Sequence, residues 1–294
     1  MTVGWAKNTQ KPIFFEKRKK SSTIDYAMPV YYGNLKLTEK KRLDQIQYRA
    51  AKLVTGALHY TSGLKLNIEL GWETLQTRFD CLGLGLFHKI HLGHTRPLVK
   101  MFMSEIQSQI YNTRVYIHYK QFPYKNKQFA SSFYPYFTNK WNNSHKTLKN
   151  ERDINEYKLK LKNIYKPSKY KFYYRGSTKV GCSYLTRLRV GRSVLNDHAY
   201  SIGLSSSPEC LCHAPRESPE HMLLKCFLYS KERLTLMSKV EKLLPKFGNF
   251  KEKRKLEILL FGIFPDNPDF YQTNKSQQIA VQQFLVSTNR LNNQ

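Results

Sequence analysis

Acidic residues and long hydrophobic runs are the two features that this 294-residue sequence lacks most clearly. It contains 21 Asp and Glu against 49 Lys and Arg, which gives a formal net charge of +28. A compact fold with so much positive charge repels itself, and a polyanionic partner is the usual reason to tolerate that repulsion. Nucleic acid is the commonest polyanion, and an anionic membrane is the alternative.

The shortage of apolar runs argues against a membrane partner. A spanning helix needs about 20 apolar residues, and the longest candidate, LGLGLF at residues 82–87, is far shorter. The N-terminal segment MTVGWAKNTQ has no apolar stretch of the kind found in secretory signals. We therefore expect a nuclear or cytoplasmic protein. In such a reducing compartment, the five cysteines are more typical of metal binding than of a disulfide framework.

Apolar residues recur at helical spacing along much of the chain, which predicts a mainly α fold. One stripe runs from Thr38 to a stop at Gly56, and a second follows an N-cap at Thr74 and ends before Gly93. Inside the second stripe, glycines at positions 83 and 85 weaken the helix and indicate close packing against another helix. Further helices are predicted after Gly181, through His198 to a stop at Gly203, then up to Leu244 before Pro245, over 251–262 and over 276–291.

The segment from Tyr111 to Lys179 combines positive charge with aromatic rings. It contains sixteen Lys and Arg against three acidic residues, together with eleven tyrosines, five phenylalanines and Trp141. Lysine and arginine can neutralise phosphates, and rings can stack on unpaired bases. Alternatively, the rings are ordinary core residues and the lysines face water. Because aromatic residues also favour strands, short strands are possible here.

Three cysteines and a histidine lie close together in PECLCHAPRESPEHMLLKC, residues 208–226. Cys210, Cys212, His221 and Cys226 form a Cys-x-Cys…His-x4-Cys arrangement, and three thiolates with one imidazole satisfy a tetrahedral structural zinc ion. The alternative is a set of small buried side chains with a hydrogen-bonded histidine. The isolated Cys81 and Cys182 are predicted to be core residues.

The spacing of these candidate ligands carries two difficulties. A single residue separates Cys210 from Cys212, which is shorter than the usual two to four, and His213 is a possible substitute ligand. His221 and Cys226 are five apart, so on one α-helix they would point about 140° away from each other. One of the two must therefore lie outside regular helix, and we expect this to be His221, at the entry turn.

The order of segments resembles the C-terminal part of non-LTR (LINE-type, jockey-like) retrotransposon reverse transcriptases. YLTRLRVGRSVLNDHAYSIGL, PECLC and ESPEHMLLKC, within residues 184–226, are similar to the helix and zinc knuckle of that family. IDYAMPVYYGNL and LDQIQYRAAKLVTGA, within residues 24–57, are similar to its thumb, and the likeness covers about residues 24–236. The resemblance implies that Cys210, Cys212, His221 and Cys226 hold Zn²⁺, and it matches Leu185, Arg187, Leu188, Arg189 and Gly191 to the preceding helix.

The metal-binding carboxylates of a polymerase palm are missing from the sequence. Reverse transcription needs such carboxylates to hold two metal ions, and no Asp-Asp pair occurs anywhere in the chain. Asp266 and Asp269 in FPDNPDF are predicted to be turn residues. No catalytic residue is therefore assigned, no small-molecule substrate is expected, and the chain is predicted to be inactive as a polymerase on its own.

Three functions are compatible with these features. The leading hypothesis is a nucleic-acid-binding fragment that holds template RNA or target DNA. Its predicted phosphate and strand contacts are Arg187, Arg189, Arg192, Lys169, Lys171, Tyr173, Tyr174 and Arg175. The second hypothesis is a part of a longer active reverse transcriptase whose palm lies upstream. The third is a zinc-stabilised protein-interaction domain, which leaves the charge of +28 unexplained.

We predict five segments along the chain. They are a basic N-terminal segment (1–22), a helical thumb-like bundle (23–108), a basic aromatic-rich connector (109–180), a zinc-knuckle module (181–247) and C-terminal helices (248–294).

Overall fold

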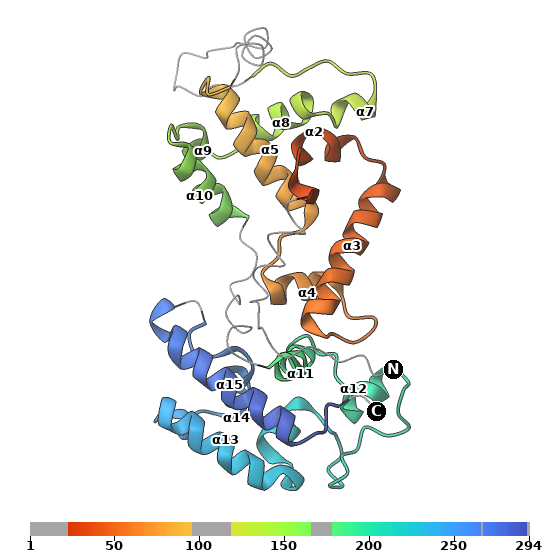
Figure 1. Cartoon of the computed structure of the whole chain (residues 1–294), viewed down its shortest axis with the longest axis vertical. Helices are drawn as coiled ribbons and strands as arrows, with labels where there is room; N and C mark the ends of the chain where they lie inside the picture. The colour runs from red at the N-terminus through yellow and green to blue at the C-terminus, as the bar shows by residue number, and fades with distance from the viewer. Residues whose placement is uncertain (1–22, 96–118, 166–177, 266, 293–294) are drawn as a thin grey trace, which may run out of the picture. The chain divides into compact units, whose positions relative to one another are not determined.

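The computed structural model describes residues 23–95, 119–165, 178–265 and 267–292, and these residues fold mainly into helices joined by irregular segments (Figure 1). They contain no β-strand, so the prediction of a mainly α protein is confirmed. Short strands, considered possible in the aromatic-rich segment, do not occur within residues 119–165, where Tyr119 makes an isolated bridge and the helices begin at Lys127. Within the described ranges, no helix combines the length and the apolar character needed to cross a membrane.

The chain forms two compact units. Unit 1 comprises residues 1–46 and 73–166, and unit 2 comprises residues 47–72 and 167–294. The boundaries predicted from the sequence do not follow this division. Residues 119–165 of the predicted connector pack into the core of unit 1, and residues 47–72 join the C-terminal part of the chain. These associations depend on contacts between segments far apart in the sequence, which local periodicity does not reveal.

Unit 1 is arranged around one long helix, α5 (Leu75–His91). Around it lie α2 (Met28–Tyr31), η1 (Tyr32–Asn34), the first part of α3 (Leu37–Thr55), α7 (Lys127–Ala130), α8 (Phe133–Asn142), α9 (Lys146–Lys149) and α10 (Ile154–Ile164). The hydroxyl of Thr74 accepts a hydrogen bond from the Thr77 amide at 3.1 Å and caps α5, as predicted. A glycine in the left-handed region follows the other end, Gly93 with φ of 75°.

The core of unit 1 is built mainly from aromatic rings. The buried ones include Phe79, Phe87, Tyr119, Phe137, Trp141 and Tyr157. A β-carbon added to Gly83 would lie 1.8 Å from the ring of Phe137, so this glycine does mark close helix packing. Gly85 has nothing within 4 Å of such a carbon, so at this position the packing prediction is wrong.

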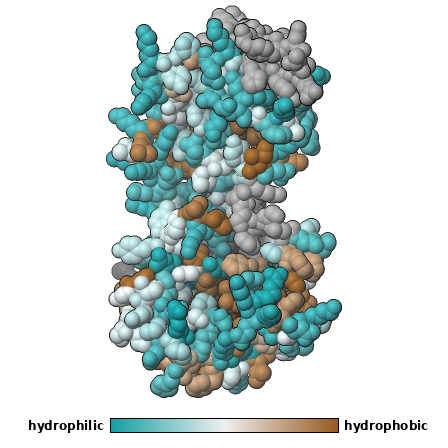
Figure 2. Space-filling view, turned by 180° about the vertical axis from the view of Figure 1, so that it is seen from behind, coloured by the Kyte–Doolittle hydropathy of each residue, from teal (hydrophilic) through white to brown (hydrophobic). Residues whose placement is uncertain are grey.

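Unit 2 is arranged around α15 (Tyr271–Ser287). This helix packs against α11 (Lys179–Arg189), α13 (Ser230–Leu243) and α14 (Glu252–Phe261). The unit also contains α4 (Gly63–Leu70), α12 (Asn196–Ser201), η2 (His221–Lys225), η3 (Phe227–Tyr229), η4 (Phe247–Asn249) and η5 (Pro268–Phe270). Its largest core cluster is mostly aliphatic, with leucines from α11, α13, α14 and α15. Hydrophilic side chains cover much of the visible face of the protein (Figure 2).

Two helices of unit 2 differ from their predicted bounds. The helix predicted to run through His198 breaks at Gly191, which has φ of 69° and separates α11 from α12. The last helix begins at Tyr271 rather than at Ser276, because its first turns bury polar side chains that hide the apolar pattern. The clearest case is Asn274, whose amide bonds both the N–H and the C=O of Ile263 at 2.8 and 2.9 Å.

Candidate metal centre

The four predicted ligands, Cys210, Cys212, His221 and Cys226, meet at one point in unit 2. Their ligand atoms all lie within 4.8 Å of one another. The sulfur atoms of Cys210 and Cys226 are 3.7 Å apart, and Nε2 of His221 is 3.1 Å from the sulfur of Cys212. In a tetrahedron with metal–sulfur bonds of about 2.3 Å, two sulfurs lie about 3.8 Å apart. The group could therefore hold a metal ion, after small movements of its most separated atoms.

A tight hairpin positions the first two ligands. The Cys210 amide donates to the Ala214 carbonyl at 3.0 Å, and the His213 amide donates to the Cys210 carbonyl at 2.8 Å. The loop can reverse in so few residues because His213 adopts the left-handed region, with φ of 63°. The single residue between Cys210 and Cys212 is thus accommodated by a turn. His213 is exposed and is not a member of the cluster.

The second pair of ligands is brought together by a π-helical turn, η2. The Cys226 amide donates to the carbonyl of His221, five residues earlier, at 2.7 Å. A π-turn takes up one residue more than an α-turn, so residues five apart return to the same side. The prediction that His221 is the ligand outside the helix is wrong. His221 is the first residue of η2, and Cys226, with an extended ψ of 122°, lies just beyond its end.

An arginine supports the π-turn from the next helix. Arg233 of α13 donates to the carbonyl oxygens of Leu223, at 3.1 Å, and of Cys226. Both carbonyls lie in or just beyond the last turn of η2, where backbone carbonyls have no partner within the helix. No sequence pattern predicts this role, because Arg233 lies inside an ordinary amphipathic pattern.

A buried ion pair supports the hairpin. Glu217 is 1% exposed, and Arg290 donates to both of its carboxylate oxygens at 2.7 and 2.6 Å. The same carboxylate accepts from the Asn196 amide at 2.8 Å, and the side chain of Asn196 donates to the Glu209 carbonyl at 2.6 Å. This network joins the hairpin, the start of α12 and the segment after α15. Sequence inspection missed all three side chains, because their partners are distant along the chain.

The protonation of the four ligands differs with their surroundings. Burial raises the pKa of the Cys210 thiol to about 12 and also raises the pKa of Cys226. Burial also disfavours the thiolate of Cys212, but the Ala214 amide and the neighbouring thiols outweigh this effect and lower its pKa. Burial lowers the pKa of His221, helped by the positive charges of Arg233 and Lys225. A neutral imidazole is the form that coordinates a metal.

Three arginines at and just after α11 were predicted to contact phosphates. Arg189 has a side chain only 2% exposed, and it donates to Glu69 at 2.8 Å and to Gln278 at 2.6 Å. Arg187 donates to the carbonyls of Gly56 and Leu291 at 3.1 and 3.0 Å. These donors serve contacts within unit 2, so we do not retain Arg187 and Arg189 as phosphate contacts.

The third arginine differs from the other two. Among the described residues the Arg192 guanidinium makes a hydrogen bond with His198 at 3.2 Å, and it lines a pocket. The remaining predicted contacts, Lys169, Lys171, Tyr173, Tyr174 and Arg175, lie outside the described residues.

No family model, curated protein or solved structure matches this chain.

Proposed function

We propose that the protein is a zinc-stabilised nucleic-acid-binding module related to the C-terminal part of LINE-type reverse transcriptases. The observation that carries the proposal is the convergence of Cys210, Cys212, His221 and Cys226 in a chain with a net charge of +28. Three thiols and an imidazole suit zinc, and they do not suit magnesium or calcium, which prefer oxygen ligands. All four ligand positions are supplied by side chains, so the ion has a structural role.

The positive charge supports a polyanionic partner, and RNA and DNA are the partners that we propose. Lys and Arg exceed Asp and Glu by 28, since 49 minus 21 is 28. Binding that neutralises phosphates releases counterions and weakens as salt rises. The module would hold a template RNA or a target DNA, and it would carry out no polymerisation by itself.

Metal content and salt dependence test this proposal on the purified full chain. Elemental analysis should find one zinc per chain, and single Cys212→Ser and Cys226→Ser variants should lose it. Fluorescence anisotropy with labelled RNA and DNA should give a plot of log K against log salt with a slope of about −3 or steeper, as for four or more neutralised phosphates on a single strand. A wild-type protein without zinc, or with an affinity indifferent to salt, would contradict the proposal.

A further inference from the structure

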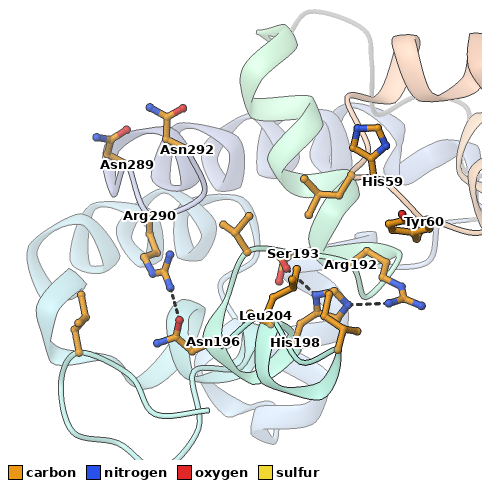
Figure 3. Close-up of a pocket in the computed structure, with 15 residues that line it drawn as sticks. His59, Tyr60, Arg192, Ser193, Asn196, His198, Leu204, Asn289, Arg290 and Asn292 are labelled. Atoms are coloured by element: carbon orange, nitrogen blue, oxygen red, sulfur yellow. Dashed lines mark hydrogen bonds between the residues drawn. The ribbon is translucent and has the colours of Figure 1, made fainter. Parts of the chain in front are cut away.

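Unit 2 contains a pocket beside the metal centre, with a volume of about 1020 Å³. Its apolar lining, here called its floor, includes Val194, Ile202 and Leu204. Arg192, Asn196 and His198 are among its polar residues (Figure 3). None of the described residues that line it is acidic. The volume lies at the upper end of the usual range for ligand sites. Together with an apolar floor and a cationic rim, it favours a flat, partly apolar, anionic ligand.

A tyrosine in a strained conformation lies at the rim. Tyr60 is 91% exposed, and its φ of 61° lies in the left-handed region. A bulky residue rarely adopts this conformation, and such outliers gather at functional sites. The turn around it is fixed from within, because the hydroxyl of the buried Thr61 donates to the Leu58 carbonyl at 2.8 Å. The ring is thus presented to solvent by a rigid turn, and it contributes little to the core.

Arg192 is oriented by a short chain of hydrogen bonds. Nδ1 of His198 lies 2.8 Å from the Ser193 carbonyl oxygen, which can only accept, so Nδ1 carries the hydrogen. Nε2 of His198 is left to accept from Nη1 of Arg192 at 3.2 Å. Figure 3 shows Arg192 and Tyr60 on the same side of the pocket, with the rest of the guanidinium pointing away from His198. A guanidinium held in this way suits a phosphate.

The hairpin that carries Cys210 and Cys212 contributes to the wall of the same pocket. Leu211, the single residue between Cys210 and Cys212, is 73% exposed and lines the cavity. Arg290 and Asn196, which connect to the hairpin through Glu217, line it as well. An ion that fixes the hairpin would therefore also fix this wall.

We propose that this pocket takes an unpaired nucleotide of a single-stranded nucleic acid. The base stacks on Tyr60 over the apolar floor, and its phosphate meets Arg192. A paired base has both faces covered by its neighbours in the duplex, so the site selects single strands. This inference rests on the function proposed above and adds to it a particular ligand form and a particular place.

Photocrosslinking and binding measurements test the site. The zinc-loaded full chain is mixed with labelled oligonucleotides of about 12 nucleotides, as single-stranded RNA, single-stranded DNA and duplex, and with a free mononucleotide. Oligonucleotides carrying 5-iodouracil, which crosslinks to aromatic side chains on irradiation, should attach at Tyr60. Replacement of Tyr60 by Ala should weaken single-strand binding by about 5- to 150-fold, from the range for one base stacked on a ring.

Matched variants separate stacking from folding. Tyr60→Phe retains a ring and should bind within about twofold of the wild type, whereas Arg192→Gln should weaken binding. Tyr60→Gly relieves the left-handed strain, so it should melt at the same or a higher temperature while it still loses affinity. Tyr26→Ala, which removes another exposed tyrosine from unit 1, should leave binding unchanged.

The outcomes of these measurements are distinct. If the wild type binds single strands but Tyr60→Ala and Arg192→Gln bind as the wild type does, the pocket proposal is wrong and nucleic-acid binding stands. Crosslinks that map outside the pocket, or duplex binding with the same dependence on Tyr60, would also overturn it. If only the free mononucleotide depends on Tyr60, the site serves a small molecule and the proposal fails. If the wild type binds no nucleic acid at all, the proposed function fails as well.

Discussion

The two units place their aromatic residues and their polar contacts very differently. Unit 1 encloses a cluster of rings, in which His88 stacks on Tyr157 with centroids 3.8 Å apart, and Trp141 is fully buried. Unit 2 has a mostly aliphatic core and adds a candidate metal centre, a buried Glu217–Arg290 pair and a tyrosine exposed at a pocket. Richness in rings and positive charge does not by itself mark a binding surface.

The two units should differ most clearly in their response to loss of the metal, because we expect the metal to stabilise unit 2 alone. Removal of zinc by a chelator, or the Cys226→Ser substitution, should produce the largest effect of all. Metal binding contributes roughly 10–16 kcal/mol in small zinc peptides, and few core residues stabilise residues 208–226 without it. Backbone hydrogen exchange should become fast in residues 208–226, which include η2, and should remain slow in α5. Equal loss of protection in α5 would show that the two units do not differ in this respect.

The Glu217–Arg290 pair offers a test of polar support in unit 2. Replacement of Glu217 by Ala leaves a partly buried guanidinium without its carboxylate, so we expect a loss of about 3 kcal/mol in the free energy of unfolding. The double variant Glu217→Leu, Arg290→Met removes both charges and should lose less than the single variant. Urea denaturation measures the free energy of unfolding of both variants, and their zinc content is a second readout. A double variant that is the less stable of the two would contradict this interpretation.

Two glycines of α5 test the tight ring packing of unit 1. Gly83→Ala would place a methyl group against the ring of Phe137 and should destabilise the protein by about 1–3 kcal/mol. Gly85→Ala, the matched control, meets no atom within 4 Å and should stabilise it by up to about 1 kcal/mol through helix propensity. Thermal unfolding distinguishes them, and a loss of equal size in both variants would show that packing against Phe137 is not the cause.

The smallest expected effect is the pH dependence that two buried histidines add to the stability of unit 1. Burial lowers the pKa values of His88 and His91, although the backbone carbonyl of Glu151 partly opposes this effect at His88. A group with a lowered pKa favours folding while it is neutral. The stability that it contributes is complete above its unfolded pKa of about 6.5 and is lost as the pH falls toward the folded value.

The expected slope is at most about 1.4 kcal/mol per pH unit for each histidine. Urea denaturation followed by tryptophan fluorescence between about pH 7 and pH 5 measures it. His88→Phe should reduce the slope, and substitution of the exposed His59 of unit 2 should not. A slope unchanged by His88→Phe would assign the pH dependence to other groups.

Local features of the fold could be predicted from the sequence, and long-range ones could not. The cap at Thr74, the stop at Gly56 and the end of α13 before Pro245 follow from the chemistry of a few neighbouring residues. The four ligands were found because cysteine and histidine are rare and were clustered. Arg189 was misjudged because its partner Glu69 lies 120 residues away in sequence. The burial of Trp141 and Tyr157 likewise depends on α5, a distant segment.

The π-turn of η2 has a consequence for how sites of this kind are found in sequences. Ligands on one face of an α-helix are three or four residues apart, yet His221 and Cys226 meet at five because the turn accommodates one more residue. A histidine and a cysteine can thus meet at a spacing of four residues in an α-turn or of five residues in a π-turn. A motif search that fixes the number of residues between ligands will therefore overlook relatives in which one residue has been inserted or deleted.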